Sequence, residues 1–335
     1  MPGSANQKIK LLYLNDILLR ETDEEHPLTA NELCELLEQR YGIKAERKSI
    51  YADLNTLNEY GTEVQKTHYP RQGVFTSQHD FEPAELRMLM DAVQASSFIS
   101  VRKTKKLLAK LGRTVSKYQA EDLQKHVFIS KGVKSENEEI YYNIDKLQKA
   151  VNQGCKIKFT YHRRRIVNSI PVKDVGKVFT FSPYAMIWNS DKYYLVGNYE
   201  KYDNLSHFRI DRIRKITLLK EPVRPFCEVS EYEDVFDTAD YASKLFNMYS
   251  GEEEQIELLC KNELLDVIID RYGLNIPYKQ VDREHFSVRI KVQISEGLIA
   301  WLMEFGGGIR VLEPKSLIDA ARAKARLIAE CYGVV

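Results

Sequence analysis

Helical spacing of apolar residues dominates the first part of the chain. Between residues 8 and 20 these residues fall on one face of an amphipathic helix. A second helix is predicted after Thr29, because Thr29 and Glu32 have the spacing of a capping box, in which each side chain bonds the backbone N–H of the other. Gly42, which follows Tyr41, is expected to end this helix.

A third helix is predicted from about residue 45 to Gly61. Ile50, Leu54 and Leu57 stand four and three residues apart, so they form one inward face.

Two short extended segments follow the third helix. They are Glu63–Thr67 and Gly73–Ser77, with a turn between them, which predicts a hairpin. Three helices followed by a hairpin is the element order of a winged helix-turn-helix. We therefore predict such a domain for residues 1–80.

Residues 83–125 have helix-forming sequence throughout, with Pro83 at a first-turn position. A strand signal returns only at Val127-Phe128-Ile129. This pattern predicts a helical linker over residues 81–135.

The pattern in the middle of the chain is typical of β-structure. After a helix predicted over residues 144–154 come short β-branched or aromatic segments, separated by turns. Strands this short and evenly spaced predict a small SH3-like β-barrel over residues 136–221. The predicted strands are Lys156–Tyr161, Val178–Phe181, Tyr184–Trp188, Lys192–Tyr199, Ser206–Ile210 and Ile213–Leu219.

Strands and helices alternate in the last part of the chain, residues 222–335, which begins at a predicted linker, Glu221–Pro225. This predicts a separate α/β domain, and the whole chain is expected to be a multidomain α+β protein. The predicted strands are Gln255–Cys260, Phe286–Val292 and Ile309–Leu312, and the helices are Leu264–Tyr272, Ser295–Phe305 and Pro314–Cys331.

The net charge of +1 conceals an uneven distribution. Residues 1–80 have 9 basic and 13 acidic groups, residues 101–134 have 10 and 2, residues 144–221 have 16 and 7, and residues 226–335 have 12 and 20. A basic middle between acidic ends favours a polyanionic partner. A solvated charged surface is the alternative.

The third predicted helix has the chemistry of a DNA major-groove reader. Arg47, Tyr51 and Asn55 are four residues apart and share its outward stripe. Arginine pairs with guanine edges and asparagine with adenine edges. The alternative is an ordinary surface helix with two basic residues. The candidate DNA-binding residues are Arg47, Lys48, Ser49, Tyr51 and Asn55 on the helix, with Lys66, His68 and Arg71 on the hairpin.

Three segments resemble those of WYL-domain transcriptional regulators. Residues 49–54, Ser-Ile-Tyr-Ala-Asp-Leu, resemble the recognition helix of the DeoR-type winged helix at the front of these proteins. Residues 181–188, 192–197 and 207–213 resemble the WYL pattern, with Tyr193-Tyr194-Leu195 at the name-giving triplet, so tyrosine replaces tryptophan. Residues 301–303 and 308–314 resemble the C-terminal extension that usually follows a WYL domain.

The resemblance implies a bacterial regulator, typically a homodimer, that binds double-stranded operator DNA. It also implies an Sm/SH3-like WYL barrel that senses an anionic ligand, such as a single-stranded nucleic acid or a nucleotide. The ligand-binding residues implied by the motif are Ser182, Tyr184, His207, Arg209 and Arg212, with Tyr161 and Tyr194 close by.

Strand alternation puts His207, Arg209 and Asp211 on one face, and arginines beside aromatic rings suit a nucleotide. Arg212 paired with a nearby carboxylate, and His207 as an ordinary core histidine, are the alternatives.

No nucleotide-binding glycine loop, HExxH or GxSxG motif occurs in the sequence, and its five cysteines are scattered. We therefore expect no catalytic residues, no metal site, no cofactor and no disulfide. No apolar run is long enough to span a bilayer and no signal peptide is evident, so we expect a cytoplasmic protein without membrane contact. The rival hypothesis is an RNA-binding or antiphage accessory protein that uses the Sm-like barrel without a specific operator.

Overall fold

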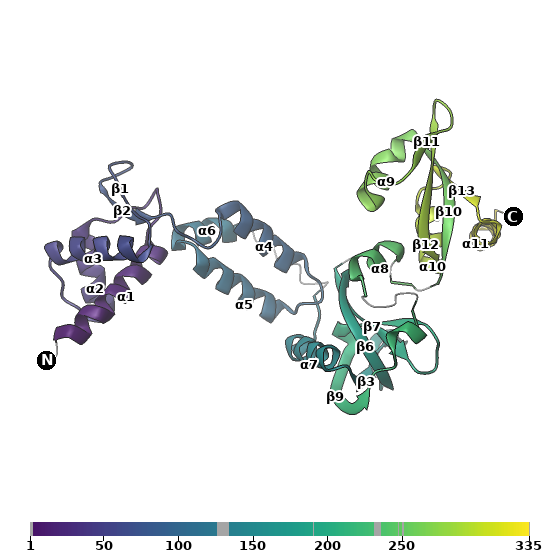
Figure 1. Cartoon of the computed structure of the whole chain (residues 1–335), viewed down its shortest axis with the longest axis horizontal. Helices are drawn as coiled ribbons and strands as arrows, with labels where there is room; N and C mark the ends of the chain where they lie inside the picture. The colour runs from purple at the N-terminus through teal and green to yellow at the C-terminus, as the bar shows by residue number, and fades with distance from the viewer. Residues whose placement is uncertain are drawn as a thin grey trace. The chain divides into compact units, whose positions relative to one another are not determined.

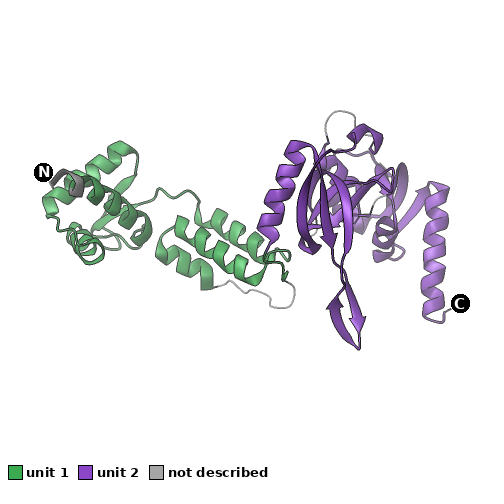
Figure 2. Cartoon of the chain, turned by 90° about the horizontal axis from the view of Figure 1, so that it is seen from below, with its two compact units in different colours: residues 1–138 green, residues 139–335 purple. Residues whose placement is uncertain are grey.

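A computed structural model describes residues 3–125, 134–189, 191–230, 236–246, 248–249 and 251–334, with side chains from residue 7 onward. The chain divides into two compact units, residues 1–138 and 139–335, coloured separately in Figure 2. No helix in the described ranges is long and apolar enough to cross a membrane. All five cysteines are free thiols, as predicted.

Three helices and a hairpin open the first unit (Figure 1). Ile50, Leu54 and Leu57 of the third helix are at most 3% exposed and pack in one core with residues of the first two. The predicted inward face is thus confirmed. The elements are α1 (Gly3–Glu21), α2 (Ala30–Tyr41), α3 (Arg47–Tyr60), β1 (Val64–Thr67) and β2 (Gly73–Thr76).

The predicted capping box at α2 is confirmed. The Thr29 hydroxyl accepts a hydrogen bond from the Glu32 backbone N–H at 3.3 Å, and the Glu32 carboxylate accepts one from the Thr29 N–H at 2.7 Å. Gly42 and Gly61 follow α2 and α3 in the left-handed conformation, which glycine adopts without steric cost.

The hairpin is fastened to the segment before α2. Strands β1 and β2 pair antiparallel, from Val64 opposite Thr76 to Thr67 opposite Gly73. Leu28 exchanges two backbone hydrogen bonds with Val74, at 2.9 and 2.8 Å. This contact fixes the position of the hairpin beside the three helices.

The segment 83–125 is largely helical, as predicted. Leu86, Met90, Leu108, Val115 and Ala120 form its own small core. The strand signal at residues 127–129 lies outside the described residues. The elements are α4 (Pro83–Ala95), α5 (Val101–Leu111), the 3-10 turn η1 (Gly112–Thr114) and α6 (Lys117–Lys125).

The second unit begins with one helix on a five-stranded antiparallel sheet, in the order β8-β7-β6-β3-β9. Phe159, Phe181 and Phe208 pack edge to face in its core. Edge strands β8 and β9 are not paired with each other among the described residues, so the sheet is shown and the barrel stays a prediction. The elements are α7 (Ile140–Gln153), β3 (Cys155–Tyr161), β6 (Lys177–Asn189), β7 (Lys192–Tyr199), β8 (Leu205–Arg209), η2 (Ile210–Arg212) and β9 (Ile213–Pro222).

Several predictions for this region need correction. The two strands predicted on either side of Ser182-Pro183 are one strand, β6, because a bulge beside Pro183 accommodates a residue that cannot donate to the ladder. A second hairpin, which the sequence patterns did not predict, follows Tyr161: β4 (Arg164–Val167) pairs with β5 (Ile170–Lys173). The predicted linker is tied to the sheet instead: β9 runs to Pro222, and Val223 donates to the Gly154 carbonyl at 2.9 Å.

Two described segments beyond β9 pack on the same sheet. Helix α8 (Thr238–Lys244), absent from the sequence prediction, packs with η3 (Phe226–Glu228) on residues of β6, β7 and β8.

The C-terminal part is a four-stranded antiparallel sheet, β11-β12-β10-β13, with three helices. Its predicted strands and helices are confirmed, and the short β11 was missed. The elements are β10 (Glu252–Lys261), η4 (Asn262–Leu264), α9 (Leu265–Tyr272), β11 (Tyr278–Gln280), β12 (His285–Ile294), α10 (Glu296–Glu304), β13 (Ile309–Glu313) and α11 (Lys315–Cys331).

Thr29→Ala should loosen α2, because loss of an N-cap hydroxyl costs about 1 kcal/mol. Hydrogen exchange of the α2 amides in the intact chain should become roughly fivefold faster. Thr56→Ala is the control: Thr56 is exposed on α3 and bonds only the Ala52 carbonyl of its own helix. Equal exchange rates in Thr29→Ala and the parent chain would contradict the capping assignment.

Candidate nucleic-acid interface and candidate ligand site

Helix α3 presents a polar stripe on the side opposite its buried face. Arg47, Tyr51 and Asn55 are all exposed. The Arg47 guanidinium donates to the Tyr51 hydroxyl at 3.3 Å and lies 5.6 Å from the centre of its ring. The stripe is therefore partly ordered before any partner binds.

The hairpin adds a cation to this stripe. The Lys66 ammonium of β1 lies 6.0 Å from the centre of the Tyr51 ring, so helix and hairpin share one surface. Lys48 and His68 are exposed. An aromatic ring with two cations within 6.0 Å of its centre, on the same stripe as an exposed amide, suits a surface that contacts phosphates and base edges.

Two further predicted DNA-binding residues contact residues outside the predicted DNA-binding set. The Ser49 hydroxyl accepts a hydrogen bond from Lys10, which is 6% exposed and also pairs with Asp53 at 2.7 Å. Arg71 pairs with the capping-box carboxylate of Glu32 at 2.8 Å. Sequence reasoning missed Lys10 and Asp53, although each is a charge beside an apolar helix face.

Internal ion pairs account for part of the acidity of residues 1–80. Glu21, which is 7% exposed, pairs with Arg40 at 2.8 Å and with Lys117 of α6 at 2.6 Å. Burial alone would raise the pKa of Glu21, but the hydrogen bonds from these two cations outweigh it and hold the pKa below its usual value. Glu21 is therefore a charge of the interior rather than of a DNA-facing surface.

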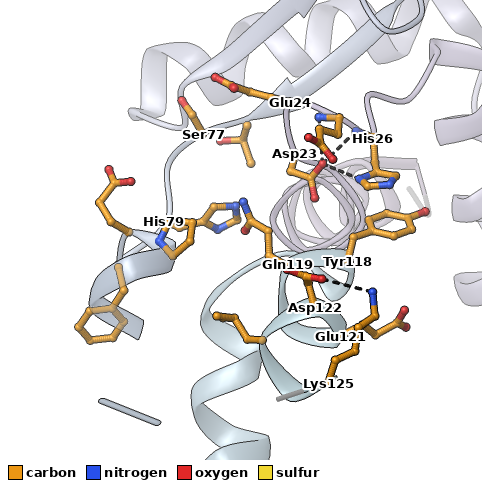
Figure 3. Close-up of a pocket in the computed structure, with 16 residues that line it drawn as sticks. Asp23, Glu24, His26, Ser77, His79, Tyr118, Gln119, Glu121, Asp122 and Lys125 are labelled. Carbon is orange, nitrogen blue, oxygen red and sulfur yellow. Dashed lines mark hydrogen bonds and ion pairs between the residues drawn. The ribbon is translucent and has the colours of Figure 1, made fainter. Parts of the chain in front are cut away.

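The same corner of the first unit contains a cavity of 690 Å³ (Figure 3). Asp23 accepts a hydrogen bond from Ser116, and the His26 and Tyr118 rings stack 3.6 Å apart. Burial lowers the pKa of His79, which is therefore neutral at neutral pH. No group of three or more acidic, histidine or cysteine side chains suited to a metal ion occurs in the described ranges. These contacts fasten α6 to the loop after α1.

In the second unit, some of the predicted ligand residues lie together near the ends of β3 and β8. Tyr194 of β7 lies opposite Arg209 of β8. The Arg209 guanidinium makes two hydrogen bonds to the Asp211 carboxylate, at 3.1 and 2.8 Å. Burial raises the pKa of Tyr194, and Tyr161 and Arg212 lie close enough to influence it. Arg212 is exposed, whereas Tyr161 is 8% exposed and packs on Phe208.

The other three predicted ligand residues contact Arg224 or Tyr241, in the segments beyond β9. The buried Ser182 hydroxyl accepts from the Arg224 N–H at 3.0 Å, and the Tyr184 hydroxyl donates to the Arg224 carbonyl at 2.7 Å. Burial raises the pKa of Tyr184 to about 12. No local signal in the sequence reveals these long-range contacts.

His207 also contacts a segment beyond β9. It shares a hydrogen bond with the Tyr241 hydroxyl of α8 at 3.0 Å. Desolvation lowers the pKa of His207 to about 4, so the ring is neutral at physiological pH. Together with Ser182 and Tyr184, it holds Arg224 and helix α8 to the sheet.

Two family models match the chain: the WYL domain over residues 142–218 and the WCX domain over residues 254–329. No curated protein matches it. The predicted WYL domain and its C-terminal extension are thereby confirmed, and the predicted winged helix lies outside both matches.

Two solved structures are similar at low identity. The proteasome accessory factor B/C (PafBC) of Arthrobacter aurescens is 16% identical, with a TM-score of 0.27 over 98% of this chain and 47% of that one, so this chain spans about half its length. A CRISPR Cas-related protein is 12% identical, with a TM-score of 0.38 over 98% of this chain and 84% of that one. From its family matches, this protein contains a WYL domain followed by a WCX domain.

Proposed function

We propose that this chain is a DNA-binding transcription regulator whose WYL domain senses an anionic ligand, a nucleic acid or nucleotide, and thereby modulates operator binding. The observation that carries the proposal is the surface where Arg47, Tyr51 and Asn55 of α3 meet Lys66 of the hairpin. Helix α3 acts as the recognition helix, and the hairpin is the wing that contacts the adjacent backbone.

The regulator acts as a homodimer in the bacterial cytoplasm. Two recognition helices then meet half-sites about 34 Å apart, one turn of DNA. Its activity is binding rather than catalysis, and it uses no cofactor.

Ligand sensing takes place at the arginine and tyrosine cluster of the WYL domain. Arg209 is held by Asp211, Tyr161 and Tyr194 lie close to it, and Arg212 lies close to Tyr194. An anionic ligand competes with Asp211 for the Arg209 guanidinium and stacks on the partly exposed Tyr194 ring. It changes operator affinity only to the extent that it binds the DNA-competent and DNA-incompetent states differently.

The helical segment α4–α6 joins the two activities along the chain. Glu21 with Lys117, Asp23 with Ser116 and His26 with Tyr118 hold α6 to the winged helix. A displacement of this segment is therefore transmitted to the body that carries α3.

Arg47→Ala should weaken binding to a duplex from upstream of the protein's own gene by roughly 5- to 150-fold, the value of one bidentate base contact. Fluorescence anisotropy at fixed salt measures this change, and binding to nonspecific duplex should change little. Lys8→Ala, at an exposed position on α1, is the matched control. Unchanged affinity in Arg47→Ala would contradict the assignment of α3 to the DNA interface.

Arg209→Ala should abolish the effect of a short single-stranded oligonucleotide on duplex affinity and leave duplex affinity itself within about twofold, because Arg209 lies outside the proposed DNA surface. The same anisotropy titration, repeated with the oligonucleotide, measures both quantities. Lys220→Ala, at an exposed position on β9, should respond normally. A normal response in Arg209→Ala would contradict the sensor assignment.

A further inference from the structure

The hairpin of β4 and β5 is the most exposed piece of regular structure in the second unit. It continues the β3–β6 ladder, whose last pair is Tyr161 with Lys177, and extends away from the sheet (Figure 2). All its strand residues are exposed except Val172, which is partly buried. At about 3.3 Å per residue, its outer end lies about 20 Å beyond the end of β3. None of its strand residues is buried in the core of the sheet.

The ribbon is basic near its base. Residues 162–177 contain five basic residues and one acidic residue, a net charge of +4. Arg164 lies directly opposite Lys173 in the antiparallel register. The register thus places two basic side chains next to each other near the base of the ribbon.

The end of the ribbon is apolar. Ile166 and Ile170 are 70% and 62% exposed, and Pro171 lies opposite Ile166. Asn168 and Ser169 make the turn between the strands with positive φ angles of 49° and 63°, which suits a tight two-residue hairpin. Each face of the ribbon therefore has at least one cation near its base and apolar groups at its end.

We propose that this ribbon is a second DNA-binding arm, which lies in the major groove of double-stranded DNA. The major groove admits a two-stranded β-ribbon, basic side chains reach phosphates at its rims, and apolar groups contact thymine methyls. A second copy of the chain fits less well, because strands of four residues offer far less than the roughly 1,000 Å² of a stable protein interface. The inference extends the proposed function, because its partner is DNA, but does not depend on α3.

The test compares two triple variants of the full chain. Arg164→Ala/Arg165→Ala/Lys173→Ala removes cations from the ribbon, and Lys279→Ala/Arg283→Ala/Arg310→Ala removes three exposed cations from the WCX domain as the control. Affinity for a nonspecific labelled duplex is measured by anisotropy over a series of salt concentrations. The ribbon variant should bind about tenfold more weakly at physiological salt. The slope of log affinity against log salt is negative, and its magnitude should decrease by about 2.7, or 0.9 for each lost phosphate contact. The control should keep the parent slope.

A second variant tests the apolar end. Ile166→Ser/Ile170→Ser should weaken duplex binding and leave the salt slope unchanged, because no cation is removed. Neither residue is in the core, so circular dichroism of both ribbon variants should match that of the parent chain.

Several results would overturn the proposal. They are a ribbon variant with the affinity and slope of its control, loss of single-strand binding with duplex binding intact, or a change of subunit association by sedimentation with no change in duplex binding. Arg47→Ala separates the two proposals, since it should reduce sequence preference and keep the parent salt slope in nonspecific binding. If the ribbon variant loses affinity and Arg47→Ala does not, the proposed role of α3 is wrong and the proposed role of the ribbon is supported.

Discussion

Burial of one face of α3 is the constraint on which the functional surface depends. Ile50, Leu54 and Leu57 lie in the core of the first unit, and each such side chain gains about 1.5–3 kcal/mol by leaving water. Rotating the helix would forfeit that free energy, so Arg47 and Tyr51 must point outward. The helix geometry that stabilises the domain is therefore also what aims its polar groups.

Some charged side chains of this protein stabilise its fold, and others are exposed on its surface. In the first unit, carboxylates such as Glu21 and Asp23 bind cations or hydroxyls of the same unit, and they hold α6 to the three-helix body. In the second unit, cations project on the β4–β5 ribbon, and Arg209 is held by a carboxylate. Because some of its carboxylates are used in internal contacts, the acidic N-terminal domain can still present the polar stripe of α3 with its cation Arg47.

Local patterns predicted the elements well. The capping box at Thr29, the stripe on α3 and the order of three helices and a hairpin need only neighbours in sequence. The misses have a common cause, because they depend on partners far along the chain. Pro183 looked like a strand break because its bulge is visible only in the pairing with β7. The contacts of Ser182, Tyr184 and His207 could not be predicted, because Arg224 and Tyr241, which make them, lie far along the chain. Whether these three residues also bind a ligand stays a prediction.

The most direct measurement of the central claim is anisotropy of the intact chain on a labelled duplex from upstream of its own gene, at fixed salt and with excess unlabelled nonspecific duplex. Salt must be fixed because affinity driven by phosphate contacts falls steeply with ionic strength. A regulator should bind this duplex in preference to the competitor, and a short single-stranded oligonucleotide should shift its affinity. Equal binding to both duplexes, with no effect of the oligonucleotide, would contradict the account.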